Sequence, residues 1–158
     1  CYAVNITKGN GNDLITAKVA INRRDVFFYT ECNDAITSHE DTNWMLLLID
    51  ADQDASTGWY GYDFLVNKEI PDAEHGSLMK YEKASGQWKE TASVDMAYEG
   101  KELELAIPMD LLGISGSSLS FDFKWAYNPR ELKDPISFCT HGDTAPNRRF
   151  NYRFIWEK

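Results

Sequence analysis

The fold of this chain is decided by residues 44–64, which read WMLLLIDADQDASTGWYGYDF. The stretch opens with an apolar run from Trp44 to Ile49 in which apolar and polar positions do not alternate. Such a run is too short for a typical helix and is typical of a strand covered on both faces. Three aspartates at alternate positions follow, and Thr57-Gly58 then turns the chain into an aromatic-rich segment. The stretch therefore predicts a buried central strand that leads into an acidic loop.

Strand-like alternation of apolar and polar residues continues on both sides of this stretch, with turn residues between the segments. Aromatic and β-branched residues, which favour strands, are frequent in these segments. We therefore expect an all-β fold with about ten strands, an antiparallel β-sandwich of the jelly-roll or immunoglobulin-like type. The expected strands lie at 15–21, 26–31, 44–49, 60–67, 77–83, 88–91, 94–98, 103–107, 121–127 and 150–156.

The chain is expected to form a single domain over residues 1–158, because no repeat, linker or second boundary interrupts the pattern. Residues 5–13 are rich in Gly and Asn and read as an irregular lead-in. Pro108 and Gly113 bound one short helical turn near 108–113. The chain begins at Cys1 without an initiator methionine, so we expect a processed product or a piece of a longer protein.

The net charge of the chain and the length of its apolar runs argue against nucleic acid and the membrane interior as partners. The chain has 25 acidic and 16 basic residues and a net charge of −9, whereas nucleic-acid binding depends on Lys and Arg. Its longest apolar run is far below the roughly 20 residues that cross a bilayer. We expect a monomer with no nucleic-acid partner and no membrane span. The three cysteines allow at most one intrachain disulfide; a Cys32–Cys139 bridge and two buried thiols both remain open.

The acidic loop is the first candidate site. Asp50, Asp52 and Asp54 bring three carboxylates close together, and their mutual repulsion would be relieved by a cation. Hard oxygen ligands of this kind suit Ca²⁺, and Asp63 approaches from the following strand. The alternative is a solvated acidic turn in which the Asp side chains cap their own backbone. The metal hypothesis is a structural calcium site at Asp50, Asp52, Asp54 and Asp63.

Aromatic side chains are the second candidate site, because saccharides present apolar C–H faces that lie flat on indole and phenol rings. Trp59 and Tyr60 are adjacent, so in a strand they face opposite ways. The core is the competing location for each tryptophan, and Trp125 shares a strand face with Phe121 and Phe123. The candidate carbohydrate-binding residues are Trp44, Trp59, Tyr60, Lys124, Trp125 and Asn128.

Motifs for catalysis are scarce in this sequence. It has no Gly-rich phosphate loop, no Gly-x-Ser-x-Gly elbow and no paired-cysteine zinc spacing. His39, His75 and His141 lie in separate polar segments without metal-ligand spacing. We therefore expect that the chain is not an enzyme by itself.

Several segments together resemble the family 9 carbohydrate-binding module and its DOMON-like relatives. The resemblance extends from about residue 12 to the C-terminus and is closest to C-terminal modules of glycan-degrading proteins of Bacteroidetes. The segments that carry it are LIDAD at 48–52 with TGWYGYDF at 57–64, LAIP at 105–108 with LLG at 111–113, and FDFKWAYN at 121–128 with GDTAP at 142–146 and RFNY at 149–152.

The resemblance implies a β-sandwich, a frequent structural calcium ion and, in sugar-binding members, a cleft lined by aromatic rings. It places calcium at the aspartate loop and a binding aromatic at Trp125. Where the family commonly reads Trp-Ala-Asp-Asn, this chain has Tyr127 in place of the aspartate, so one carboxylate of a transferred sugar site is missing.

Taken together, these features predict a non-catalytic carbohydrate-binding module of a secreted, periplasmic or cell-surface bacterial glycan-degrading protein. Its expected partners are a saccharide and a neighbouring catalytic domain. One alternative is a structural accessory domain that packs on a glycoside hydrolase domain. Another is a haem-binding electron-transfer domain, for which relatives use a methionine ligand; the candidates are Met45, Met79, Met96 and Met109.

Overall fold

The computed structural model of the chain describes residues 2–5, 14–139, 142–147 and 150–157. Within these residues it is an all-β protein whose strands pair antiparallel in one continuous sheet, in the order β1-β2-β3-β8-β7-β6-β5-β4-β9-β10, with β11 also paired to β9. The strands are β1 (Tyr2–Asn5), β2 (Leu14–Ile21), β3 (Asp25–Cys32), β4 (Leu46–Asp50), β5 (Phe64–Val66), β6 (His75–Glu82), β7 (Gln87–Glu99), β8 (Glu102–Pro108), β9 (Ser118–Tyr127), β10 (Asp143–Ala145) and β11 (Tyr152–Glu157).

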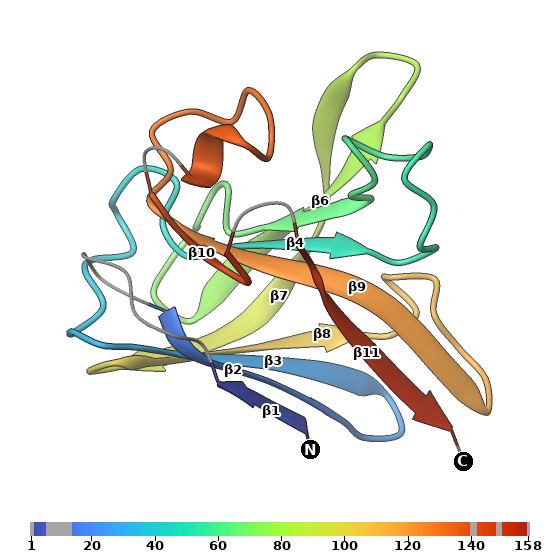
Figure 1. Cartoon of the computed structure of the whole chain (residues 1–158), viewed down its shortest axis with the longest axis horizontal. Helices are drawn as coiled ribbons and strands as arrows, with labels where there is room; N and C mark the ends of the chain where they lie inside the picture. The colour runs from blue at the N-terminus through green and yellow to red at the C-terminus, as the bar shows by residue number, and fades with distance from the viewer. Residues whose placement is uncertain (1, 6–13, 140–141, 148–149, 158) are drawn as a thin grey trace.

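The sheet curls until its two halves face each other, as Figure 1 shows. Phe28 on β3 contacts Phe121 and Phe123 on β9, with ring centroids 5.6 and 5.4 Å apart. Near the two ends of the sheet, the Leu14 backbone N–H on β2 donates to Asp143 Oδ2 on β10 at 2.8 Å. The predicted all-β antiparallel fold is confirmed, and the facing layers are halves of one nearly closed, barrel-like sheet.

Most of the predicted strands are present, with shifted boundaries. Residues 88–91 and 94–98 form one long strand, β7, because its first part pairs with β6 and its last part with β8. The strand predicted at 60–67 is only β5, because residues 59–62 form a tight turn instead. The short strands β1 and β10 were not predicted. The predicted lead-in lies mainly outside the described residues.

The helical turn predicted near 108–113 is present as a series of hydrogen-bonded turns. Pro108 is the last residue of β8, and its carbonyl accepts from the Leu111 N–H at 3.1 Å. The carbonyl of Met109 accepts from the N–H groups of Leu112 and Ile114 at 3.2 and 3.1 Å. Gly113 ends the turn with φ of +68°, a left-handed conformation that glycine adopts without a Cβ clash.

Strand β4 is buried on both faces, as its unbroken apolar run predicted. Leu47 and Ile49 belong to the main core inside the curled sheet. Leu46 and Leu48 belong to a second, outer core beneath the turn at 59–62 and the segment that contains Phe138. This segment includes a short 3₁₀ helix, η1 (Ser137–Cys139). The protein therefore has apolar layers on both sides of its central strand.

Cys32 is a buried, free thiol. Burial raises the pKa of this thiol to about 12, so it stays protonated at neutral pH. Of the two interpretations of the cysteines, Cys32 therefore fits the buried thiol. The side chain of Cys139 lies outside the described part of the chain.

Substitution of Phe28 by Ala tests the contact between the two halves of the sheet. The Phe28 side chain is fully buried, so Phe28→Ala is expected to lower the free energy of unfolding by about 3–5 kcal/mol. Phe27→Ala is the matched control, because Phe27 precedes Phe28 on the same strand, points to the opposite face and is only half-buried. Urea unfolding of both variants measures the difference. Equal losses in the two variants would contradict this account of the core.

Candidate functional site

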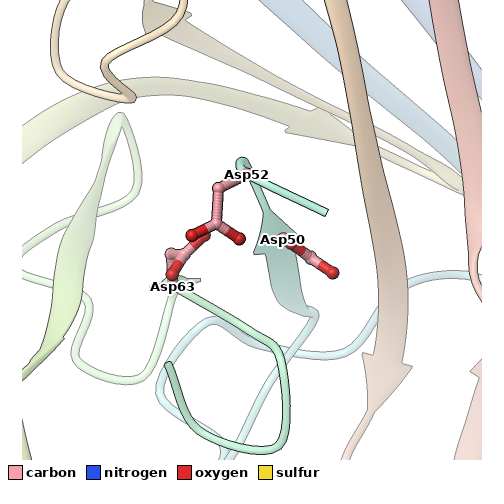
Figure 2. A group of neighbouring side chains, drawn as sticks. All are labelled: Asp50, Asp52 and Asp63. Carbon is pink, nitrogen blue, oxygen red and sulfur yellow. The ribbon is translucent and has the colours of Figure 1, made fainter. Parts of the chain in front are cut away.

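Three of the four predicted metal ligands meet at the end of β4. Asp50 is the last residue of β4, and Asp52 and Asp63 lie at the two ends of the loop that follows. Each offers one carboxylate oxygen, and these oxygens all lie within 4.8 Å of one another. Figure 2 shows Asp52 and Asp63 facing each other with Asp50 beside them. We call these three residues the acidic cluster; Asp50 is buried, Asp63 is half-buried and Asp52 is exposed.

Hydrogen bonds within the loop hold the acidic cluster in place. Asp50 Oδ1 accepts from the Gln53 N–H at 2.6 Å, and Asp63 Oδ2 accepts from the Ala51 N–H at 2.9 Å. The backbone N–H of Asp63 also donates to the Ile49 carbonyl at 2.9 Å, which returns the chain to the end of β4. Thr57 Oγ1 lies 3.0 Å from Asp52 Oδ2 and adds an oxygen that sequence reasoning missed.

Asp54, the fourth predicted ligand, does not join the acidic cluster. Its Oδ1 atom accepts from the Ser56 N–H at 2.9 Å and from Ser56 Oγ at 2.7 Å. These hydrogen bonds lower the pKa of the exposed Asp54 carboxyl. The alternate spacing of the aspartates would place them on one face only in a continuing strand, but β4 ends at Asp50. Asp54 is instead the self-capping turn residue that was the alternative interpretation.

The acidic cluster is electrostatically unfavourable on its own. Burial raises the pKa of Asp50 to about 6, and the neighbouring carboxylates of Asp63 and Asp52 contribute to the rise. Burial also raises the pKa of Asp63. A carboxyl group with a raised pKa costs free energy when it is ionised, and a nearby cation would offset that cost.

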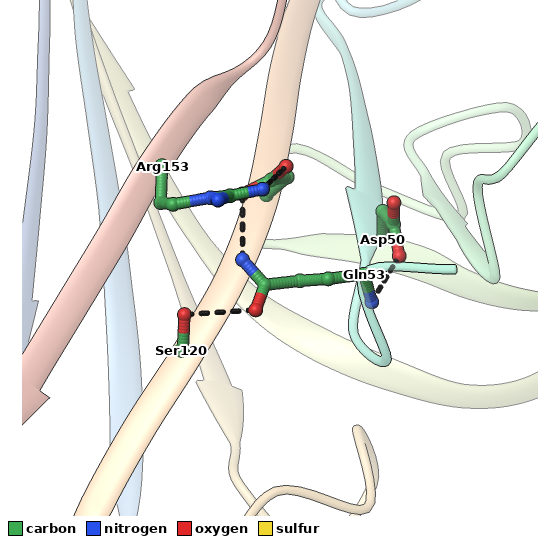
Figure 3. A network of polar contacts seen from close by, with 5 residues as sticks. Asp50, Gln53, Ser120 and Arg153 are labelled. Atoms are coloured by element: carbon green, nitrogen blue, oxygen red, sulfur yellow. Dashed lines mark hydrogen bonds and ion pairs between the residues drawn. The ribbon is translucent and has the colours of Figure 1, made fainter. Parts of the chain in front are cut away.

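A polar network ties the loop of the acidic cluster to β9 and β11 (Figure 3). Gln53 Nε2 donates to Asp122 Oδ1 at 2.9 Å, and Gln53 Oε1 accepts from Ser120 Oγ at 2.9 Å. Arg153 donates to both oxygens of Asp122, at 2.7 and 2.9 Å. Nothing in the sequence pattern predicted this network, because its members are far apart in the chain. It fixes the loop that carries Asp52 against β9.

Aromatic rings form a row on the outer face of the sheet, next to the acidic loop. The Trp59 ring lies 5.2 Å from that of Tyr60 and 6.0 Å from that of Trp88, centroid to centroid. The Trp88 ring lies 5.2 Å from that of Tyr81, its cross-strand partner on β6. Tyr60 is 64% exposed, and the other three side chains are half-buried. We call Tyr60, Trp59, Trp88 and Tyr81 the outer aromatic row.

The turn at 59–62 presents the first two rings of this row. Trp59 and Tyr62 pair through two backbone hydrogen bonds of 2.8 and 3.1 Å. Gly58 has φ of +57°, and a Cβ atom there would lie 2.2 Å from the Tyr62 carbonyl oxygen. The turn therefore requires glycine at position 58. Sequence reasoning found Trp59 and Tyr60 but missed Tyr81 and Trp88, whose proximity depends on the pairing of β6 with β7.

Trp44 and Trp125, two predicted carbohydrate-binding residues, lie in the main core and are completely buried. Trp44 Nε1 donates to the Thr37 carbonyl at 3.0 Å, and its ring packs 4.9 Å from that of Tyr98. Trp125 points inward from β9, as its alternation with Phe123 indicated. Neither ring is accessible to a saccharide in this structure, so their assignment to the binding surface is corrected.

Lys124 and Asn128, the predicted polar binding residues, do not lie on an open face. Lys124 is completely buried, and Nζ donates to the carbonyls of Pro146 and Phe150 at 2.7 and 2.9 Å. Lys124 was predicted to contact a saccharide, but its ammonium group is instead enclosed by the protein and bound by the Pro146 and Phe150 carbonyls. Backbone carbonyls compensate a buried ammonium group that would otherwise be costly. Asn128 is half-buried just after β9 and has φ of +44°.

The methionines of the haem alternative are mostly core residues. Met45, Met79 and Met96 are buried, and Met109 is half-buried. His39 Nδ1 lies 2.9 Å from the Tyr98 hydroxyl, and His75 Nδ1 lies 2.9 Å from Asp72 Oδ1. His141 lies outside the described residues.

No protein-family model, curated protein or solved structure matches this chain. Among the described residues, no helix has the length and apolar character required to cross a membrane.

The raised pKa of Asp50 predicts a pH dependence of stability in a chelator-containing buffer. The pKa of Asp50 is 3.8 in the unfolded chain and about 6 in the folded chain. At pH values between these two, the folded chain holds a proton on Asp50 that the unfolded chain has lost. The free energy of unfolding should therefore fall as the pH rises from about 4 to 6, by on the order of 2 kcal/mol. Urea unfolding across this range measures the change.

Asp50→Asn isolates the contribution of this carboxyl from those of other titrating groups. The free energy of unfolding of the native chain, minus that of Asp50→Asn, is expected to fall as the pH rises from 4 to 6. A difference that is independent of pH would contradict the burial-induced pKa shift.

Proposed function

We propose that the chain is a non-catalytic carbohydrate-binding module and that the outer aromatic row is its binding surface. The observation that carries this proposal is the grouping of four partly exposed rings, Tyr60, Trp59, Trp88 and Tyr81, on one face of the molecule. Isolated exposed aromatics are common, whereas contiguous exposed apolar surface marks an interaction site.

The chemistry of the row suits a saccharide. Pyranose rings present apolar C–H faces, which pack on aromatic rings, and hydroxyl groups, which need polar partners. Glu90 is exposed and lies two residues from Trp88 on β7, so it projects from the same face of the strand. Its carboxylate and the Tyr60 hydroxyl can hydrogen-bond to sugar hydroxyls beside the rings. Trp44, Lys124 and Trp125 have no part in this proposal because they are buried.

The acidic cluster supports a structural calcium ion in the same proposal. Three carboxylates with oxygens within 4.8 Å of one another are hard donors of the type that Ca²⁺ prefers. Asp50, Asp52 and Asp63 would hold the ion, and its positive charge would offset the cost of ionising the buried Asp50. Since the cluster and Trp59 share one loop, the ion would stabilise the loop that presents the outer aromatic row.

The rest of the proposal follows the family resemblance. A module of this kind would belong to a longer secreted or cell-surface glycan-degrading protein of a bacterium, and its second partner would be the neighbouring catalytic domain. Its role would be to keep that domain near its polysaccharide substrate.

Saccharide binding is tested by isothermal titration with a panel of hexasaccharides, such as cellohexaose, xylohexaose and mannohexaose. The native chain is expected to bind at least one of them. Trp88→Ala and Trp59→Ala should each weaken that binding roughly 5- to 150-fold, if each ring contributes the 1–3 kcal/mol of a base–aromatic stacking contact. Phe150→Ala is the matched control, since Phe150 is 71% exposed and does not belong to the row. Absence of binding to the whole panel would contradict the proposal.

Calcium binding is tested by the melting temperature in calcium and in chelator. A ligand at 100 times its Kd stabilises the folded state by about 2.7 kcal/mol. For a domain of this size that corresponds to a rise in Tm of roughly 5–10 °C. Asp63→Asn should abolish the rise, and Asp54→Asn should retain it because Asp54 lies outside the acidic cluster. An unchanged Tm of the native chain, or equal effects of both substitutions, would contradict a calcium ion in the cluster.

A further inference from the structure

One end of the curled sheet holds an open-sided cavity that the proposed saccharide surface does not use. Its volume is about 1280 Å³, above the 300–1,000 Å³ typical of small-molecule sites. It lies where the β2–β3 turn, the turn after β8 and the end of β11 meet, at the lower right of Figure 1. Its apolar lining is formed by Ile21, Met109, Leu111, Ile114, Leu119 and Trp156.

The cavity is preformed, because hydrogen bonds hold the turns around it. In the β2–β3 turn, Asn22 Oδ1 accepts from the N–H groups of Arg24 and Asp25 at 2.7 and 2.6 Å. The Met109 N–H donates to the Arg24 carbonyl at 2.9 Å and joins this turn to the turn after β8. A ligand would therefore not need to order these two turns when it binds.

Two arginines, Arg23 and Arg24, line the same cavity and are exposed. Arg24 Nε lies 3.6 Å from Asp25 Oδ1, so its charge is partly compensated. Arg23 makes no hydrogen bond or ion pair with the residues that the structure describes. Asp110 also lines the cavity, and its Oδ1 atom accepts from the Leu111 N–H at 3.0 Å. In a chain of net charge −9, an uncompensated guanidinium at an apolar cavity favours an anionic ligand group.

We propose that this cavity binds a small amphipathic carboxylate, with its apolar body against Leu119 and Trp156 and its carboxylate on Arg23. Mouths of β-barrels are frequent sites for small ligands. An apolar lining favours an alkyl or aromatic body, and a guanidinium pairs with a carboxylate through two parallel hydrogen bonds. The site is separate from the outer aromatic row and does not depend on saccharide binding.

Isothermal titration of the native chain with octanoate, octan-1-ol and octylammonium tests the proposal. Octanoate is expected to bind saturably with one site per chain, and the alcohol and the ammonium at least about tenfold more weakly. No saturable binding of octanoate, or equal binding of octan-1-ol, would overturn the proposal.

Substitutions at exposed positions then locate the site. Arg23→Ala should weaken octanoate binding about tenfold and leave octan-1-ol binding unchanged, and Ser115→Trp should block both ligands by filling the cavity at Ser115. Arg130→Ala is the control, because Arg130 follows the opposite end of β9 and is also exposed. Circular dichroism confirms that each variant is folded. Octanoate binding that survives both Arg23→Ala and Ser115→Trp would place the ligand elsewhere and overturn the proposal.

Discussion

Burial of β4 on both faces is the constraint on which the rest of this structure depends. Leu47 and Ile49 pack inside the curled sheet, while Leu46 and Leu48 pack against the outer core. Full burial of each such side chain contributes about 1.5–3 kcal/mol. Because the strand is held from both sides, the position of its last residue, Asp50, is fixed as well. The loop that follows must then cross the outer face before it returns to β5.

That loop connects the acidic cluster to the outer aromatic row. Asp63 returns to the end of β4 through its hydrogen bond with the Ile49 carbonyl, and Gln53 anchors the loop to β9. Between these anchors lies the turn that presents Trp59 and Tyr60. Lys83 Nζ, near the tip of the β6–β7 hairpin, donates to the Ser56 carbonyl at 3.0 Å and joins the loop to the strands that carry Tyr81 and Trp88. A substitution that moves the loop would therefore affect Trp59 and Tyr60 directly and Tyr81 and Trp88 through the Lys83 hydrogen bond.

Local sequence pattern predicted the fold well, because alternation and unbroken apolar runs report directly on which strand faces are buried. The β2–β3 hairpin and the doubly buried β4 are examples. The pattern failed where contacts between segments far apart in the sequence determine whether a side chain is buried and which side chains are neighbours. Lys124 has the alternation of a solvated residue, but a distant segment covers it. Trp88 joins Trp59 only through strand pairing and the turn at Gly58. Asp54 lies outside the acidic cluster, because the strand that would have kept the aspartates on one face ends at Asp50.

The central claim is that ligand recognition belongs to the outer aromatic row while Trp44 and Trp125 serve the core. It is tested most directly by the indole N–H signals of the tryptophans in ¹⁵N-labelled protein, recorded with and without the hexasaccharide that binds. The account predicts that the signals of Trp59 and Trp88 shift during the titration and that those of Trp44 and Trp125 stay in place. Shifts at Trp44 or Trp125 with unchanged signals of Trp59 and Trp88 would contradict it.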